Sequence, residues 1–244
     1  MTTAQRYNRP PIVEAVIDLK FEGNLSDREL ERLRDRFKAR FPSIEEKKNI
    51  QIEVRTDQII TNSFSAGFKM TAENAIDLIL TNPDSFGSVR LAPYNKWESL
   101  LAAAKDNFDL FTKVVGRKKI VRIGVRYINR FDIPNAKIEG RPLSEFIRVG
   151  ISLPMEVSTV TGGFSFSVSG VEVSTGAKLI INGGVIIPPA LLEHTSISLD
   201  IDVYWDADIP MRLEDMWVKT DVLRHAKNAV FEHCITDELR ALFQ

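Results

Sequence analysis

Three arginines recur at every fourth position of one β-branched segment, and they are the first residues in this sequence that could do chemistry. Residues 119–131 alternate as a half-buried strand does, which would place on one face Arg122, Arg126 and Arg130. Guanidinium groups bind phosphate through paired hydrogen bonds, so such a row could follow a phosphate chain. The alternative is cross-strand ion pairing on a solvated sheet face.

Acidic side chains on two further predicted strands, 12–21 and 195–205, could be partners of these arginines. The faces that carry them hold four candidate carboxylates: Glu14, Asp18, Asp200 and Asp202. If these strands neighbour the arginine strand, the acids neutralise the arginines. If the sheet closes into a barrel or lines a cleft, the acids could hold Mg²⁺ or Mn²⁺ while the arginines hold phosphates.

That second arrangement resembles the triphosphate tunnel enzymes, whose first strand carries alternating acids followed by a lysine. Glu14, Asp18 and Lys20 give part of this pattern, and Val16 stands where another acid is expected. The acids of strand 195–205 resemble the late acidic strand of that family. The resemblance implies a metal-dependent phosphate-ester or nucleotide-binding enzyme with a polar tunnel.

Histidine, cysteine and motif chemistry give little support to an enzyme. His225 and His233 are eight residues apart on one predicted helix, too far to share a metal, and Cys234 has the apolar neighbours of a core residue. The sequence has no Walker loop, no GxGxxG, no GxSxG and no HExxH. We therefore expect no cofactor, with Mg²⁺ or Mn²⁺ only in the tunnel alternative, and we favour a non-enzymatic role.

Composition and charge indicate a globular protein of the cytoplasm. The 244 residues include 32 basic and 33 acidic side chains, a balance that gives no general attraction to nucleic acid or anionic lipid. The single cysteine suits a reducing compartment, and we expect neither a signal peptide nor a membrane span. Nucleic-acid binding through the arginine row and helix 26–41 is the weakest alternative, because acids interrupt the basic face of that helix.

The order of the predicted elements indicates an α+β fold. Strands are predicted at 12–21, 50–61, 64–70, 76–81, 86–91, 119–131, 163–173, 178–187 and 195–205, and helices at 26–41, 96–115, 142–148, 212–234 and after Thr236. We expect a mainly antiparallel sheet with helices on one face, in one compact unit 1–244 with loosely similar halves 10–134 and 140–244. The alternative is a closed antiparallel barrel with flanking helices.

The long C-terminal helix has an apolar face with interspersed charges. We expect this face to pack across the sheet, and the alternative is a surface for docking a partner chain. The residues proposed for that interaction surface are Trp217, Arg224 and Lys227.

Three stretches together resemble a sporadically distributed, uncharacterised prokaryotic family of conserved hypothetical proteins of about this length. They are the start Pro10-Pro11-Ile12-Val13-Glu14-Ala15-Val16, the run Arg126-Tyr127-Ile128-Asn129-Arg130, and an ending that includes Lys227-Asn228, Phe231, Ile235-Thr236 and Leu242-Phe243. The resemblance spans the whole chain and implies a single-unit protein without appended catalytic domains. It brings no activity, cofactor or catalytic residue.

These observations favour a binding or assembly module that acts through a protein partner or as a homo-oligomer. A patchy family distribution would suit a mobile-element or phage-defence operon.

Overall fold

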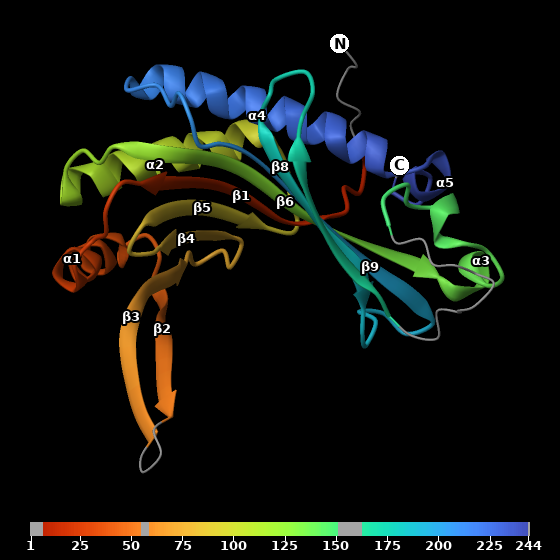
Figure 1. Ribbon diagram of the computed structural model, residues 1–244, viewed down its shortest axis with the longest axis horizontal. Coiled ribbons are helices and arrows are strands. Elements are labelled where there is room, and N and C mark those ends of the chain that lie inside the picture. The colour runs from red at the N-terminus through yellow and green to blue at the C-terminus, as the bar shows by residue number, and fades with distance from the viewer. Residues whose placement is uncertain (1–6, 55–58, 151–162, 244) are drawn as a thin grey trace. The chain divides into compact units, whose positions relative to one another are not determined.

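The computed structural model describes residues 7–54, 59–150 and 163–243, together with the side chains of these ranges outside residues 49–65. Within this part of the chain, nine strands form a single antiparallel sheet in the order β2-β3-β4-β5-β1-β6-β9-β8-β7 (Figure 1). Five helices pack against it. The predicted α+β class is confirmed. The barrel alternative is wrong, because the sheet is open and its order ends at β2 and β7.

The bounds of the elements follow the chain. The strands are β1 Ile12–Phe21, β2 Ser43–Val54, β3 Ile59–Thr71, β4 Asp77–Thr81, β5 Ser85–Leu91, β6 Ile120–Pro134, β7 Ser165–Val171, β8 Lys178–Ile186 and β9 His194–Trp205. The helices are α1 Asp27–Phe37, α2 Trp97–Val115, α3 Asn135–Ile138, α4 Leu213–Cys234 and α5 Asp237–Arg240, with a 3₁₀ turn at Leu143–Glu145.

The chain divides into two compact units. The larger unit comprises Met1–Ala15, Ala92–Tyr94 and Gly124–Gln244, and the smaller unit comprises Val16–Leu91 and Asn95–Ile123. Strands β1 and β6 contribute to both units. They pair in each: Arg130 N donates to Pro11 O in the larger unit, and Glu22 N donates to Lys119 O in the smaller, both at 2.9 Å. The halves 10–134 and 140–244 stay a prediction.

In the smaller unit, α1 begins at the capping box that the sequence predicts. Glu29 N donates to Ser26 Oγ at 3.3 Å, and Ser26 N donates to Glu29 Oε2 at 2.8 Å. The helix ends at Phe37 and not at the predicted residue 41. Proline disfavours a helical conformation in the residue before it, so Pro42 keeps Phe41 out of the helix.

Aromatic rings in mutual contact form the core of the smaller unit. Phe86 of β5 lies 4.9 Å from Phe111 of α2 and 5.8 Å from Phe37 of α1, measured between ring centroids. All three side chains are buried. Helix α2 packs on β5, and α1 packs on α2 and β3, so the aromatic cluster holds both helices on the sheet.

The β2–β3 pair corrects the predicted strands 50–61 and 64–70. Strand β2 starts at Ser43 and ends at Val54, and β3 runs from Ile59 through Thr71 in antiparallel register, with Ile44 opposite Met70. The consecutive charges of residues 45–48 hid the start of β2, because they break the apolar alternation that marks a strand.

The register of β2 and β3 shifts between Lys47, opposite Gly67, and Lys48, opposite Ser65, so β3 has an extra residue next to Gly67. Gly67 has φ +98°, and a Cβ there would overlap the carbonyl oxygen of Thr81 in the neighbouring strand. Only glycine fits this backbone conformation and this close approach.

In the larger unit, the second half of β6 is followed in the sheet by β9, β8 and β7. Strand β9 alternates as predicted, with one face fully buried: Ile197, Leu199, Ile201 and Val203. Helix α4 packs on β9 (Figure 1). Across the described residues, no helix is both long and apolar enough to cross a membrane.

Candidate functional site

Strand β6 places the three candidate arginines on one face, as its alternation predicts. The odd-numbered residues of the same stretch point to the other face and are buried, among them Ile123, Val125, Tyr127 and Phe131. The neighbours of β6 in the sheet are β1 and β9, which carry the candidate acids. Arginines and acids can therefore meet between adjacent strands.

Arg122 lies in the smaller unit and forms an ion pair with Asp18 of β1. Its Nη1 donates to Asp18 Oδ2 at 2.9 Å, and both side chains are mostly buried. Lys20, on the same strand, pairs with Asp84 at 3.2 Å at an exposed position.

Arg126 lies in the larger unit and makes a two-pronged contact with Asp200 of β9. Its Nε and Nη2 donate to the two carboxylate oxygens at 2.8 and 2.7 Å. Asn182 Nδ2 on β8 donates a third hydrogen bond to Asp200, at 3.1 Å. The Asp200 side chain is only 9% exposed, so this carboxylate depends on Arg126 and Asn182 for its hydrogen bonds.

The charge around Arg126 is strongly negative. The hydrogen bonds to Asp200 raise the pKa of Arg126 above its usual value, burial lowers it, and the charges of Asp200, Asp202 and Glu14 raise it further. Three of the four predicted metal ligands thus act on this guanidinium. The fourth, Asp18, belongs to the Arg122 pair in the smaller unit.

Arg130 ends the row in a smaller network. Its Nε donates to Asp132 Oδ2 at 3.0 Å, and the other oxygen of Asp132 accepts a 2.6 Å hydrogen bond from Ser196 Oγ. Each candidate arginine therefore has a carboxylate partner. This agrees with the alternative in which the arginines form ion pairs on a sheet face. Over the described ranges, His, Cys, Asp and Glu form no group of three or more that could hold a metal ion. Phosphate and metal binding stay predictions.

The proposed interaction residues of α4 face the core for the most part. Trp217 and Lys227 are buried, and Arg224 is partly exposed. The burial of Trp217 and Lys227 agrees with the expected packing of this helix face.

Lys227 is a feature that the sequence reasoning missed. Its side chain is 3% exposed, and its Nζ lies 3.5 Å from the ring centroid of Tyr127. Burial lowers the pKa of Lys227 to about 7; Arg224 adds to the shift, and Glu232 opposes it. The Tyr127 hydroxyl is 2.6 Å from that of Tyr94. The sequence contains a signal for this burial, because Lys227 is four residues from both Leu223 and Phe231 on the apolar face of the helix.

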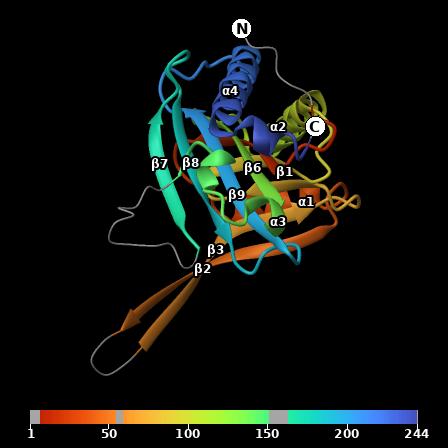
Figure 2. The same ribbon diagram turned by 90° about the vertical axis from the view of Figure 1, so that its right-hand side faces the viewer.

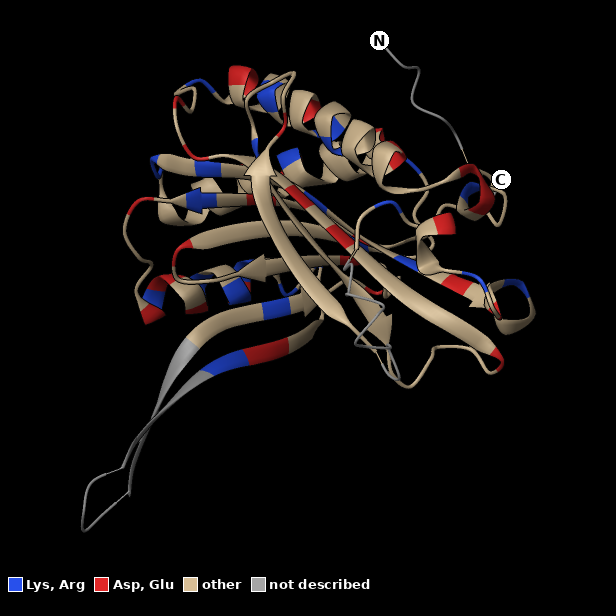
Figure 3. Ribbon diagram, turned by 45° about the vertical axis from the view of Figure 1, so that its right-hand side comes forward, with Lys and Arg blue, Asp and Glu red and all other residues tan. Residues whose placement is uncertain are grey.

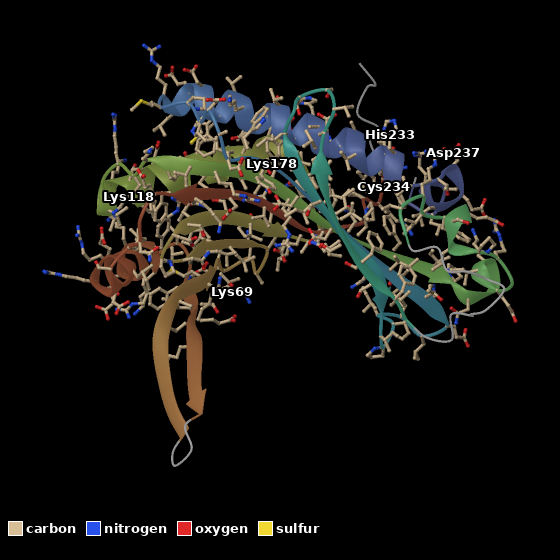
Figure 4. The ribbon with its side chains drawn as sticks, viewed as in Figure 1. Lys69, Lys118, Lys178, His233, Cys234 and Asp237 are labelled. Carbon is tan, nitrogen blue, oxygen red and sulfur yellow. The ribbon has the colours of Figure 1, made fainter. Side chains whose placement is uncertain are left out.

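Cys234 is a buried residue at the end of α4, next to His233. Figure 4 shows His233 and Cys234 together at the end of α4. The Cys234 thiol is buried, and burial raises its pKa to about 11. A thiol with that pKa is a poor nucleophile at neutral pH.

Large exposed apolar side chains are distributed unevenly in the described part of the chain. All of them belong to the larger unit: Val168, Val171, Val173, Ile187, Leu191, Leu192, Met211, Leu213, Val218 and Val222. They occur on β7 and the turn after it, on the connection from β8 to β9, and around the start of α4.

No family model matches the sequence, and the search of curated proteins finds no similar protein. The resemblance to the sporadically distributed prokaryotic family stays a prediction.

Proposed function

We propose that this chain is a binding or assembly module that acts by docking a protein partner on its larger unit. The observation that carries the proposal is the concentration of exposed apolar side chains in that unit. Single exposed apolar residues are common on any protein, but a unit that carries all of the large exposed ones in the described part of the chain is a candidate for contact with a partner. Met211 is fully exposed, and Leu192 is 90% exposed, so each would gain about 1.5–3 kcal/mol if a partner covered it.

Two charge substitutions in the larger unit test this function. Leu192→Lys and Val218→Lys place a charge on exposed side chains and leave the core untouched. The tagged full-length protein is isolated from cells that express it naturally, and the stoichiometry of copurifying protein is measured. We expect the wild type to retain a partner at fixed stoichiometry. The protein that carries both substitutions should retain at least about tenfold less of this partner, because a charge must be desolvated at the interface.

Ala102→Lys, at an exposed position of α2 in the smaller unit, is the matched control and should retain the partner. Retention by the larger-unit variants equal to that of this control would contradict the proposal. A wild-type protein that isolates alone and monomeric would also contradict it.

The alternative of a metal-dependent phosphate-ester or nucleotide-binding enzyme rests on Arg126 and the acids around it. A phosphate that binds the Nε and Nη2 edge of Arg126 would have to displace Asp200 from it. Thermal unfolding with Mg²⁺ or Mn²⁺ plus inorganic triphosphate or nucleotides tests this alternative. A ligand at a hundredfold excess over its dissociation constant would stabilise the fold by about 2.7 kcal/mol.

For a binding module we expect no metal-dependent shift of the unfolding midpoint. A shift that is present in the wild type and lost in Arg126→Ala or Asp200→Ala would favour the enzyme. The shift on ligand addition is compared within each variant, so a lower starting midpoint does not affect the result.

The proposal places the chain in the cytoplasm, where a lone thiol such as Cys234 stays reduced. A role in a mobile-element or phage-defence operon agrees with a partner-dependent module and belongs to the same proposal.

A further inference from the structure

Strand β7 is the outermost strand at one end of the sheet. It pairs with β8, from Ser165 opposite Gly184 to Val171 opposite Lys178, and in the part of the chain that the structure describes it has no second neighbour in the sheet (Figure 2). Most of its side chains are exposed, including Val168 at 47% and Val171 at 59%. An edge strand of this kind is a template for pairing with another chain.

The sequence of β7 lacks the features that protect edge strands. Its seven residues, Ser-Phe-Ser-Val-Ser-Gly-Val, contain no charge and no proline. Strand β2, at the other end of the sheet order, carries four consecutive charged residues at 45–48. Figure 3 shows this contrast, with β7 uncoloured and charged bands on β2. Charged residues and prolines are the usual means of blocking edge pairing, so β7 is open to pairing and β2 is protected.

The charged groups next to β7 are held by other partners. The Glu172 carboxylate accepts hydrogen bonds from Ser174 and Thr175, including Thr175 N at 2.9 Å, and is buried. Lys178, labelled at the start of β8 in Figure 4, donates to Asp206 at 2.7 Å. Neither charge needs to be desolvated when a strand approaches β7.

The hydrogen bonds to β8 identify the backbone groups that β7 leaves available. Val185 N donates to Phe164 O at 3.0 Å, and Glu172 N donates to Ala177 O at 2.7 Å. The even-numbered residues of this stretch therefore direct their backbone groups toward β8. By the alternation of an antiparallel ladder, four odd-numbered residues direct theirs outward: Ser165, Ser167, Ser169 and Val171.

We propose that a second copy of this chain pairs with β7, antiparallel and centred on Val168. This inference rests on the proposed function, to which it adds a contact between two copies of the chain at β7. In this register Ser165 pairs with Val171 of the second copy, and Ser167 pairs with Ser169 of the second copy. Each such pair exchanges two backbone hydrogen bonds, and the twofold symmetry repeats both pairs.

The side chains fit this register on both faces. Val168 lies in one cross-strand row with Ile181 and Ile201. Pairing would place it beside Val168 of the second copy and continue the apolar row across the junction. The other face would join the exposed serines of the two strands.

Phe166 gives an independent argument for the same register. Its ring covers Gly183, its partner in β8, where an added Cβ would overlap the ring. In the proposed pairing Phe166 lies opposite Gly170 of the second copy. A glycine would again leave room for the ring, so the face that carries Phe166 and Val168 repeats pairings already found inside the sheet.

The absence of charged residues on β7 favours a second copy of the chain as the partner strand. A twofold junction brings identical residues together, which repels wherever a strand is charged. A strand with no charge pairs with its own copy at no such cost. It also offers no charge complementarity to an acidic or basic peptide.

Sedimentation equilibrium of the full-length protein over a range of concentrations tests the pairing. We expect the wild type to approach twice its monomer mass. Val168→Lys should weaken the dimer at least about tenfold, because two like charges would stand opposite each other at the centre. Ala102→Lys, at an exposed position of α2 in the smaller unit, is the matched control and should leave the dimer unchanged.

Cysteine cross-linking tests the register itself. Residue 168 of the two copies would form a pair with Cα atoms about 4.5–5.5 Å apart, which a disulfide can span. Residue 171 of the two copies would be six residues out of register, or about 20 Å apart. Oxidation should therefore join Val168→Cys into a covalent dimer and leave Val171→Cys monomeric, and the buried Cys234 should not compete.

A wild type that is monomeric at every concentration, or Val171→Cys that cross-links as readily as Val168→Cys, overturns the edge pairing. Such results leave the proposed function to its own test, because the Leu192 and Val218 variants report on any protein partner. Loss of that partner together with a monomeric wild type would mean that the module binds a different protein.

Discussion

Replacing Lys227 with methionine is expected to stabilise the protein by about 3 kcal/mol at neutral pH. The buried amine has its pKa lowered from 10.5 to about 7, chiefly by burial. At about 1.4 kcal/mol per pKa unit, this shift corresponds to a cost of up to about 5 kcal/mol for the folded state. Methionine also loses the contact between Lys227 Nζ and the Tyr127 ring, so we expect the net gain to stay below this limit.

The stabilising effect of Lys227→Met should depend on pH. In the unfolded chain Lys227 keeps its proton up to about pH 10.5, but in the folded protein it keeps it only up to about pH 7. Between these values the unfolded state binds more protons, so the free energy of unfolding of the wild type should rise with pH. The advantage of Lys227→Met should be largest at and below pH 7 and should shrink toward pH 10.

Chemical denaturation at about pH 7 and about pH 10 measures both effects. Lys219→Met is the matched control: Lys219 is on the same helix and lies over the Trp205 ring at 4.7 Å, but it is partly exposed. We expect the control to change stability by less than about 1 kcal/mol, with no such trend in pH. A Lys227→Met protein that is less stable than the wild type at pH 7 would show that the buried amine stabilises the fold.

Replacing Arg126 with leucine is expected to lower the free energy of unfolding by about 2 kcal/mol. The substitution removes both guanidinium hydrogen bonds from Asp200, whose side chain is 9% exposed, and leaves a buried carboxylate with Asn182 as its remaining donor. Breaking a fully buried pair costs about 3–5 kcal/mol. Because the Arg126 side chain is 45% exposed, water reaches the site and reduces that cost.

A double variant distinguishes the cost of leaving Asp200 unpaired from the cost of losing the packing of the Arg126 side chain. Adding Asp200→Asn to Arg126→Leu removes the stranded charge and keeps an acceptor for Asn182, so most of the lost stability should return. Arg130→Leu is the matched control on the same strand. Its partner Asp132 keeps the Ser196 hydrogen bond, and the cost should stay below about 1 kcal/mol. Equal losses for Arg126→Leu and Arg130→Leu in denaturant titrations would contradict this account of Asp200.

Local periodicity predicted the elements that position the arginine row. The alternation of residues 119–131 placed Arg122, Arg126 and Arg130 on one face, and β6 confirms it because its other face is buried. Alternation depends only on the two-residue repeat of a strand, so one sequence carries the information. It could not show that Arg122 and Arg126 belong to different compact units.

Strand order and the pairing of distant residues could not be predicted from the sequence. A closed barrel and an open sheet give the same alternation, and only the sheet order, with β2 and β7 at its two ends, separates them. Asp18 and Asp200 looked equivalent as acids on polar faces. Their partners depend on which strand lies next to β6 and on the register, and neither is a property of the local sequence.

Edge position and burial explain what else the sequence missed. The uncharged stretch 165–171 looks like any short strand until its place at the end of the sheet order is known. Lys227 looked like a surface charge, because lysines usually extend to solvent. Its position on the apolar face of α4, over Tyr127, made it a core residue.

The native mass of the full-length wild-type protein, measured by light scattering as it is isolated from its own cells, tests partner docking most directly. Docking on the larger unit predicts a particle heavier than one chain, with a second protein at fixed stoichiometry, either another copy or a different chain. A particle of monomer mass in every preparation and at every concentration would contradict the proposed function.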